Sequence, residues 1–161
     1  MKTPIKTKTV IGRAEQVRFP QLDGKKVYAR IDSGARTSAI WGSANIDDQN
    51  VLWVSFFGHM DKNYSFHKFG KQAVTSSNGH IDVRFTVKLS VVLSGRKIRA
   101  TFTIANRQTQ VYPVLIGRNV LRGKFIVDVQ KGKALIQSEK KKIAYLEVLA
   151  KAEDYDESEA V

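Results

Sequence analysis

Apolar and polar residues alternate along much of this chain with the period of a β-strand. Val27, Ala29 and Ile31 share one face over residues 26–31, and every second residue is apolar from Ile81 to Val91 within a run that ends at Leu93. This alternation predicts strands that are buried on one face. Further strands are predicted where branched and aromatic residues gather, at 51–57, 98–105, 111–116, 125–129 and 134–137.

Glycine turns separate these strands. Asp23-Gly24, Asn78-Gly79, Ser94-Gly95 and Lys131-Gly132 each offer a residue that tolerates positive φ. Many short strands joined by such turns indicate an all-β barrel or sandwich.

Two stretches have helical patterns. Residues 118–122 form a short one after Gly117, and residues 138–151 form a longer one. On the longer helix Ile143, Leu146 and either Leu149 or Ala150 share a face opposite lysines. We expect that helix to dock on the barrel or on a partner. The predicted organisation is a flexible N-terminus (1–9), a barrel domain (10–137), the helix (138–151) and a disordered acidic tail (152–161).

Length and composition narrow the class of protein. A chain of 161 residues with 42% hydrophobic and 26% charged residues is typical of one globular domain. It has no apolar run of about 20 residues and no apolar leader, so we expect no membrane association and a cytoplasmic location. With no cysteine, disulfides and thiolate metal sites are excluded.

The charge is unevenly distributed. Five of the 15 acidic residues lie in 152–161, so the first 151 residues hold 27 basic and 10 acidic residues, a net charge of +17. Such a body attracts polyanions, either nucleic acid or an acidic peptide. A lysine-rich soluble surface explains the same composition without a ligand.

The most informative motif is Asp32-Ser33-Gly34, which follows the apolar strand 26–31 directly. A strand that ends in an acid, a hydroxyl and a glycine presents a carboxylate on a tight loop, because Gly34 permits a close turn. The same tripeptide also forms ordinary β-turns.

A second segment lies roughly 80 residues later. Ile116 ends an apolar strand, and Gly117-Arg118-Asn119 begins a short helix. In this order the two segments resemble the retropepsin pattern, and more closely a bacterial family of retropepsin-like aspartic peptidases that is sometimes labelled ATP-dependent zinc protease. Further matching strings are Ile11 to Glu15, Asp32 to Ala39, Asn106-Arg107 and Phe125 to Asp128. The resemblance covers about residues 10–130.

The resemblance implies a closed retropepsin-like β-barrel with a short helix after the Gly-Arg segment and a C-terminal helix. It also implies an aspartic endopeptidase, in which two carboxylates about 3 Å apart share a proton. Because the chain has one Asp-Ser-Gly, it supplies half of such a site, and the resemblance implies a homodimer.

Residue roles follow from the same resemblance. Asp32 is the expected catalytic residue. Ser33, Gly34, Ala35, Arg36 and Thr37 are expected to support the loop and meet the substrate backbone, while Ile116, Gly117, Arg118 and Asn119 pack beneath it. A flap that closes over the substrate is expected at the hairpin containing Ser77, Asn78 and Gly79, with Gly70 and Gly95 as alternative tips.

One position departs from the viral retropepsins. Where those enzymes carry an acid that pairs with the arginine of the Gly-Arg segment, this chain has Arg36, as its bacterial relatives do. Arg118 is therefore expected to pair with Asp128 or with a substrate carboxylate, and Arg36 favours an acidic peptide.

Neither a metal nor a cofactor is expected, because His59, His67 and His80 have no metal-ligand spacing. Two other functions stay open. One is a non-catalytic module of the same fold that binds acidic peptides, since family members often sit beside ligases that add glutamate to proteins. The other is a basic β-barrel that binds nucleic acid.

Overall fold

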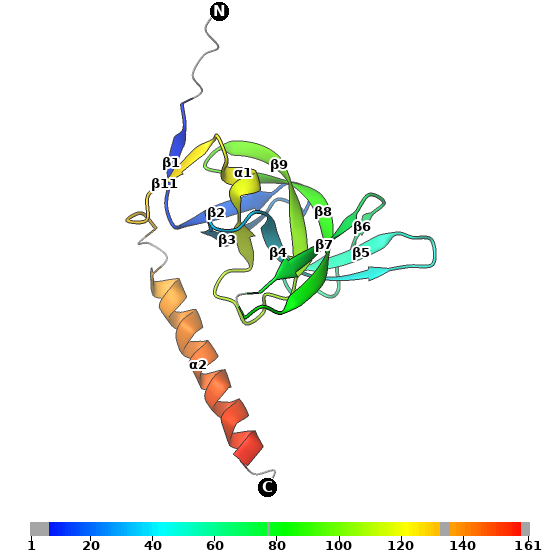
Figure 1. The fold of residues 1–161 in the computed structure, drawn as a ribbon, viewed down its shortest axis with the longest axis vertical. Helices are drawn as coiled ribbons and strands as arrows, with labels where there is room; N and C mark the ends of the chain where they lie inside the picture. The colour runs from blue at the N-terminus through cyan, green and yellow to red at the C-terminus, as the bar shows by residue number, and fades with distance from the viewer. Residues whose placement is uncertain (1–6, 77, 133–135, 159–161) are drawn as a thin grey trace, which may run out of the picture.

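Six strands pair side by side and close into a barrel (Figure 1). In the computed structural model, which describes residues 7–76, 78–132 and 136–158, the pairing order is β10-β3-β2-β8-β9-β4. A further pairing of β4 with β10 closes the ring. The strands are β1 (Thr9–Ile11), β2 (Ala14–Phe19), β3 (Lys25–Ile31), β4 (Ser38–Ile46), β5 (Leu52–Phe56), β6 (Tyr64–Phe66), β7 (Gly70–Thr75), β8 (Ile81–Leu93), β9 (Arg96–Ala105), β10 (Val114–Ile116) and β11 (Phe125–Val127). The helices are α1 (Arg118–Leu121) and α2 (Ile136–Ser158).

Three additions extend from the ring. The first half of the long strand β8 leaves the barrel and pairs with β7 as a projecting hairpin. Strands β5 and β6 continue the sheet beyond β4. Strands β1 and β11 form a separate parallel ribbon, in which Val10 lies opposite Ile126.

The barrel interior is filled by the inward faces of its strands. Phe19 and Phe102 are fully buried and meet edge to face with ring centroids 5.5 Å apart. Leu89, Ile40 and Leu52 are also fully buried around them. Burying large side chains at this density supplies most of the free energy of folding.

The structure confirms the predicted all-β class and barrel. The predicted alternation from Ile81 to Leu93 is buried only in its second half, because Ile81 and Val83 lie on the hairpin and are each 65% exposed. The strand predicted at 134–137 is wrong for Ile136 and Gln137, which begin α2, and residues 134 and 135 lie outside the described residues.

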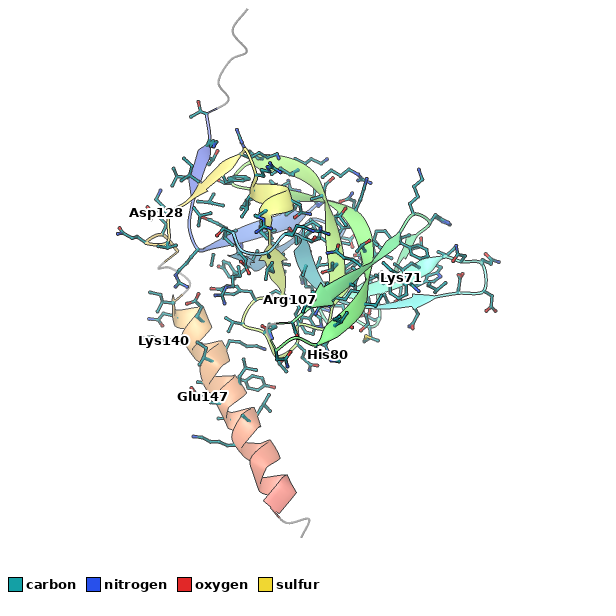
Figure 2. All side chains as sticks on the ribbon, viewed as in Figure 1. Lys71, His80, Arg107, Asp128, Lys140 and Glu147 are labelled. Atoms are coloured by element: carbon teal, nitrogen blue, oxygen red, sulfur yellow. The ribbon has the colours of Figure 1, made fainter. Side chains whose placement is uncertain are left out.

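Helix α2 is longer than predicted and runs away from the barrel, as the labelled residues Lys140 and Glu147 show (Figure 2). It begins at Ile136 and continues to Ser158, into the segment for which the sequence predicts disorder. No proline or glycine interrupts this stretch, so the helix has no local signal to end at residue 151. Its apolar side chains Ile143, Tyr145 and Val148 are exposed.

Candidate active site

Asp32 follows the last residue of β3 at one end of the barrel. Strand β10 runs parallel to β3, with Ile116 opposite Ile31, and the Asp32 amide donates to the Ile116 carbonyl at 2.9 Å. The two sequence segments that carry the resemblance are therefore neighbouring strands. Their ends bring the Asp-Ser-Gly loop against the Gly-Arg-Asn turn.

The Asp32 carboxylate is fixed by its own loop. Its Oδ1 atom accepts hydrogen bonds from the Gly34 amide at 2.9 Å and from the Ala35 amide at 3.1 Å. A Cβ atom at Gly34 would lie only 3.2 Å from Oδ1, which explains the glycine. Both bonds use the same carboxylate oxygen, and Asp32 is only partly buried.

Gly117 permits the closest backbone approach beneath this loop. A Cβ atom there would meet the carbonyl oxygens of Ala35 and Thr37 at 2.8 and 2.9 Å. The next residue, Arg118, donates from its amide to the Ala35 carbonyl at 2.8 Å and from its guanidinium to the Gly34 carbonyl at 3.1 Å. Any side chain at position 117 would force these two loops apart.

A hydrogen-bond network centred on the buried Ser38 ties the Gly-Arg-Asn turn to strands β4 and β9. Asn119 Oδ1 accepts from the Ser38 amide at 3.1 Å and from the Ser38 hydroxyl at 2.8 Å, while Asn119 Nδ2 donates to the Thr101 carbonyl at 2.8 Å. The same hydroxyl accepts from the Gly117 amide at 2.9 Å. Because Ser38 is fully buried, these partners replace water and hold the loop rigidly.

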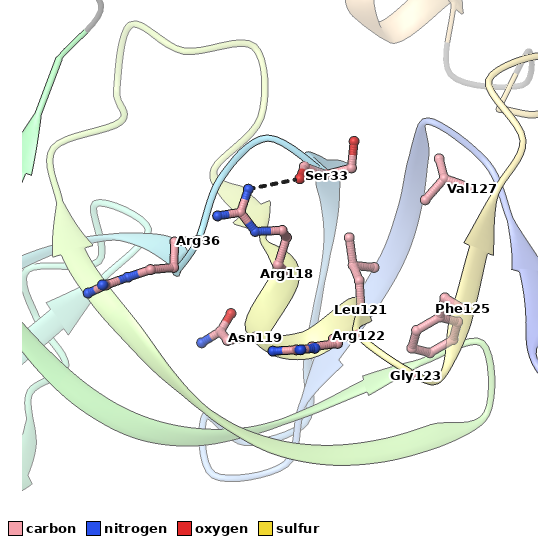
Figure 3. Close-up of a pocket in the computed structure, with 9 residues that line it drawn as sticks. All are labelled: Ser33, Arg36, Arg118, Asn119, Leu121, Arg122, Gly123, Phe125 and Val127. Atoms are coloured by element: carbon pink, nitrogen blue, oxygen red, sulfur yellow. Dashed lines mark hydrogen bonds between the residues drawn. The ribbon is translucent and has the colours of Figure 1, made fainter.

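A hollow of about 810 Å³ opens beside the loop (Figure 3). One wall is cationic, formed by Arg36, Arg118 and Arg122, and the other is apolar, formed by Leu121, Phe125 and Val127. Ser33 and Asn119 also line it, and the Ser33 carbonyl accepts from Arg118 at 3.4 Å.

A second group of arginines lies around Arg107, within electrostatic range of Asp32. Burial, together with the positive charges of Arg84 and Arg30, lowers the pKa of Arg107 below its usual value, whereas the negative charge of Asp32 acts in the opposite direction. Arg107 is held in place by a bond from Nε to the Tyr112 carbonyl at 3.1 Å. Arg107 is therefore fixed within electrostatic range of the Asp32 carboxylate.

The hairpin predicted as a flap exists and is connected to the loop. Ser76 and His80 close its turn, with the Ser76 amide donating to the His80 carbonyl at 2.8 Å, and Gly79 has a φ of 81°. At its base, Gln72 donates from Nε2 to the Thr37 hydroxyl at 3.1 Å. Asn78 and Gly79 lie in the turn, and Ser77 lies outside the described residues.

One predicted contact is wrong. Arg118 binds the carbonyls of Ser33 and Gly34, whereas the Asp128 carboxylate accepts from the Gln130 amide at 3.0 Å. Arg118 reaches the loop backbone directly because α1 begins beneath it.

Sequence reasoning also missed three residues of the site. Ser38 was only part of a motif string, and Gln72 and Arg107 lie far from Asp32 in the chain. The motif Asn106-Arg107 could have drawn attention to Arg107. The position of Arg107 near Asp32, however, depends on how the loop after β9 folds.

A closed barrel whose Asp-Ser-Gly loop rests on a Gly-Arg-Asn turn defines a retropepsin-like fold. The chain belongs to the RimB-like family, described as retropepsin-like aspartic endopeptidase RimB, whose profile matches residues 10–140. This match confirms the family that the motifs predict.

Curated relatives carry a different name. A protein of Shewanella halifaxensis named "Probable alpha-L-glutamate ligase" is 33% identical over an alignment of 131 residues, and the match covers 75% of this chain and 28% of that protein. A protein of the same name from Desulfotalea psychrophila is 29% identical over 131 residues, with the same shares of the two chains. The chain thus spans a little over a quarter of the length of these relatives.

A solved structure shares the fold. The crystal structure of Lpg0085 from Legionella pneumophila, a protein titled as having unknown function, superimposes with a TM-score of 0.59. The two sequences are 19% identical, and the match covers 77% of this chain and 95% of the other. Within the described ranges, neither helix has the length and apolar character needed to span a bilayer.

Proposed function

We propose that this protein is an aspartic endopeptidase that acts as a homodimer, in which Asp32 of each chain supplies one half of the catalytic pair. The observation that carries the proposal is the Asp32 loop itself. One carboxylate oxygen is held by two backbone amides, and the loop is braced from below by Arg118 and Asn119. A carboxylate held this rigidly is preorganised for chemistry.

The reaction needs a second carboxylate. Two acids about 3 Å apart cannot both ionise, so one keeps its proton. The ionised one takes a proton from water, and the protonated one donates to the carbonyl oxygen as the water attacks the peptide carbon. With one Asp-Ser-Gly per chain, a two-fold axis beside Asp32 supplies the missing group.

The surface next to the loop suits such a dimer. The β1–β11 ribbon exposes Val10 (45%) and Ile126 (52%), which are opposite each other in register. The hollow lined by Leu121, Phe125 and Val127 adjoins this ribbon, since Phe125 and Val127 belong to β11. A projecting apolar ribbon beside the apolar wall of the hollow can pair with its own copy, as a two-fold interface requires.

The charges around Asp32 favour an acidic peptide as substrate. Arg107 lies within electrostatic range of Asp32, Arg30 and Arg84 lie near Arg107, and Arg36 and Arg118 line the hollow. Side-chain carboxylates of a peptide would neutralise these guanidinium groups. The β7–β8 hairpin, anchored to Thr37 through Gln72, would close over the peptide.

A second function rests on the relatives' names. The chain matches part of proteins named as glutamate ligases, and a ligase of that kind makes acidic products. The same cationic cleft, without turnover, would be a module that holds such a product. The peptidase needs Asp32 for cleavage, whereas the binding module does not need Asp32 for any chemical step.

The decisive test compares wild type with Asp32→Asn on glutamate-rich and on unmodified peptides between pH 4 and 7. The amide cannot accept the proton of water, so we expect cleavage of the acidic peptide to fall by roughly a thousandfold. Mass spectrometry of the products measures the cleavage, and Asp61→Asn, at an exposed loop position, is the matched control.

If Asp32→Asn cleaves as well as wild type, the mechanism is wrong. If both proteins bind the acidic peptide equally and neither cleaves it, the binding module is the correct function.

A further inference from the structure

A row of cations crosses the outer face of the barrel, away from Asp32. In register, Lys26 of β3 lies opposite Arg18 of β2, Arg18 lies opposite Val92 of β8, and Val92 lies opposite Lys97 of β9. All three basic side chains are exposed. Neighbouring strands are about 4.8 Å apart, so the row spans about 14 Å.

The row leads into a second hollow of about 770 Å³. Lys97 is common to both, and Arg96, Arg122 and Lys124 line the hollow beside it. The Arg96 guanidinium is fixed by the carbonyls of Lys124 at 3.0 Å and Thr7 at 3.2 Å. The cationic surface thus continues from a flat sheet into a concave site.

The cations on this face repel one another, so an anionic ligand would be favoured there. Like charges opposite each other on a sheet are destabilising, as Lys26 and Arg18 are here. In the part of the chain that the structure describes, none of the six cations forms an ion pair, whereas Arg13, Lys62 and Arg84 each do. Strands β3 and β9 contain no acidic residue.

An exposed aromatic ring adjoins the row. Tyr28 lies two residues beyond Lys26 on β3, on the same face of the sheet, and is 42% exposed. Proteins that bind single-stranded nucleic acid combine a line of cations, which contacts the phosphate backbone, with aromatic rings on which the bases stack. An acidic peptide uses the cations but gains nothing from stacking on Tyr28.

We infer that this face, defined by Arg18, Lys26, Arg96, Lys97, Arg122 and Lys124, binds the phosphate backbone of single-stranded nucleic acid, with Tyr28 stacking on a base. Most of the face lies away from the candidate active site, because Lys26 and Asp32 lie six residues apart along an extended strand, about 20 Å. Arg122, at the edge of the face, also lines the hollow beside Asp32. The peptidase would thereby act on substrates held near nucleic acid.

Binding of labelled oligouridylate and oligothymidylate of about 16 nucleotides, measured by fluorescence anisotropy across a salt series, tests this inference. We expect the triple variant Arg18→Gln, Lys26→Gln, Lys97→Gln to bind roughly 100-fold more weakly than wild type at about 0.1 M salt, with the logarithmic salt slope reduced by about 2. Tyr28→Ala should lose about tenfold, and Tyr28→Phe should bind as wild type does.

The matched control removes three charges elsewhere, with Lys140→Gln, Lys141→Gln and Lys151→Gln on the exposed part of α2. Equal losses in the two triple variants would overturn the inference, because net charge alone would then govern binding. Displacement of the oligonucleotide by polyglutamate at equal charge concentration would overturn it too. Wild-type affinity in Asp32→Asn would support two separate sites, whether or not the chain proves to be a peptidase.

Discussion

Ser38 and Asp32 belong to the same short segment of the sequence, but they differ in burial. Asp32 is partly exposed at the loop surface, whereas Ser38 is fully buried and exchanges hydrogen bonds with Asn119 and Gly117. The buried hydroxyl anchors the far end of the loop that carries the acid, and Arg118 and Gln72 hold the loop in between.

Replacing Ser38 with alanine should destabilise the protein. The Gly117 backbone amide and the side-chain oxygen Oδ1 of Asn119 would each lose a buried partner, at a cost of about 1–3 kcal/mol in the free energy of unfolding. Urea unfolding measures this change. Ser43→Ala, on the exposed side of the same strand β4, should change the free energy by less than about 0.5 kcal/mol. Equal effects at the two positions would show that the network does not support the loop.

At the scale of residues, the sequence predicted local motifs and missed long-range contacts. Asp32 and Gly117 could be singled out because each lies in a short string with a steric or chemical meaning. Gln72 and Arg107 could not, because their contacts with Thr37 and Asp32 arise only when distant strands pair. The expected Arg118–Asp128 pair failed because no sequence pattern specified that Arg118 lies directly beneath the loop carbonyls.

Helix α2 is fastened to the barrel at its first turn. Glu139 accepts two hydrogen bonds from the Arg13 guanidinium, at 2.6 and 2.9 Å, and another from the Tyr112 hydroxyl. Lys142 adds a bond to the Gln108 carbonyl at 3.1 Å. Tyr112, Gln108 and Arg107 belong to one loop, so α2 is attached to the loop that approaches Asp32.

Acid should release this attachment. The bond from Arg13 holds the pKa of Glu139 below its usual 4.5, so the contact contributes its full stability above that pH and loses it as pH falls through the lowered value. The NMR signals of the Tyr112 ring should be constant from pH 7 down to the usual glutamate pKa of 4.5 and should move only below it. Burial and Glu139 raise the pKa of the Tyr112 phenol to about 12, so the ring itself does not titrate in this range.

Glu139→Gln should loosen the helix at neutral pH, because the amide cannot form the charged pair with Arg13. Faster trypsin cleavage at Lys140 and Lys141 would report the change. Glu147→Gln, farther along the same helix, should leave the cleavage rate as in wild type. If both variants are cleaved at the wild-type rate, Glu139 does not hold the helix.

At the scale of elements, strands with strong alternation were predicted and weakly patterned ones were not. Strand β8 was predicted with its bounds correct, whereas β2 and β4 were missed. In β4 the inward positions include Ser38 and Gly42, which are small or polar and conceal the period of two. The end of α2 could not be placed because no helix-stop residue follows residue 151 before the end of the chain.

Two groups of cations lie at different places on the described part of the molecule. One includes Arg30, Arg84 and Arg107, of which Arg107 is within electrostatic range of Asp32. The other crosses the outside of the barrel through Arg18, Lys26 and Lys97. The sequence indicated only that the first 151 residues are very basic, since net charge carries no information about position.

The central claim for the whole molecule is that two copies of the chain share one catalytic site. An experiment that mixes wild-type and variant chains tests this claim most directly. Asp32→Asn chains are added to wild type at constant total concentration, with free exchange of subunits, and cleavage of the acidic peptide is followed. If the catalytic pair takes one Asp32 from each chain, an equal mixture retains about one quarter of the wild-type activity. A linear fall, with half of the activity retained, would mean that each chain works alone and would contradict the shared site.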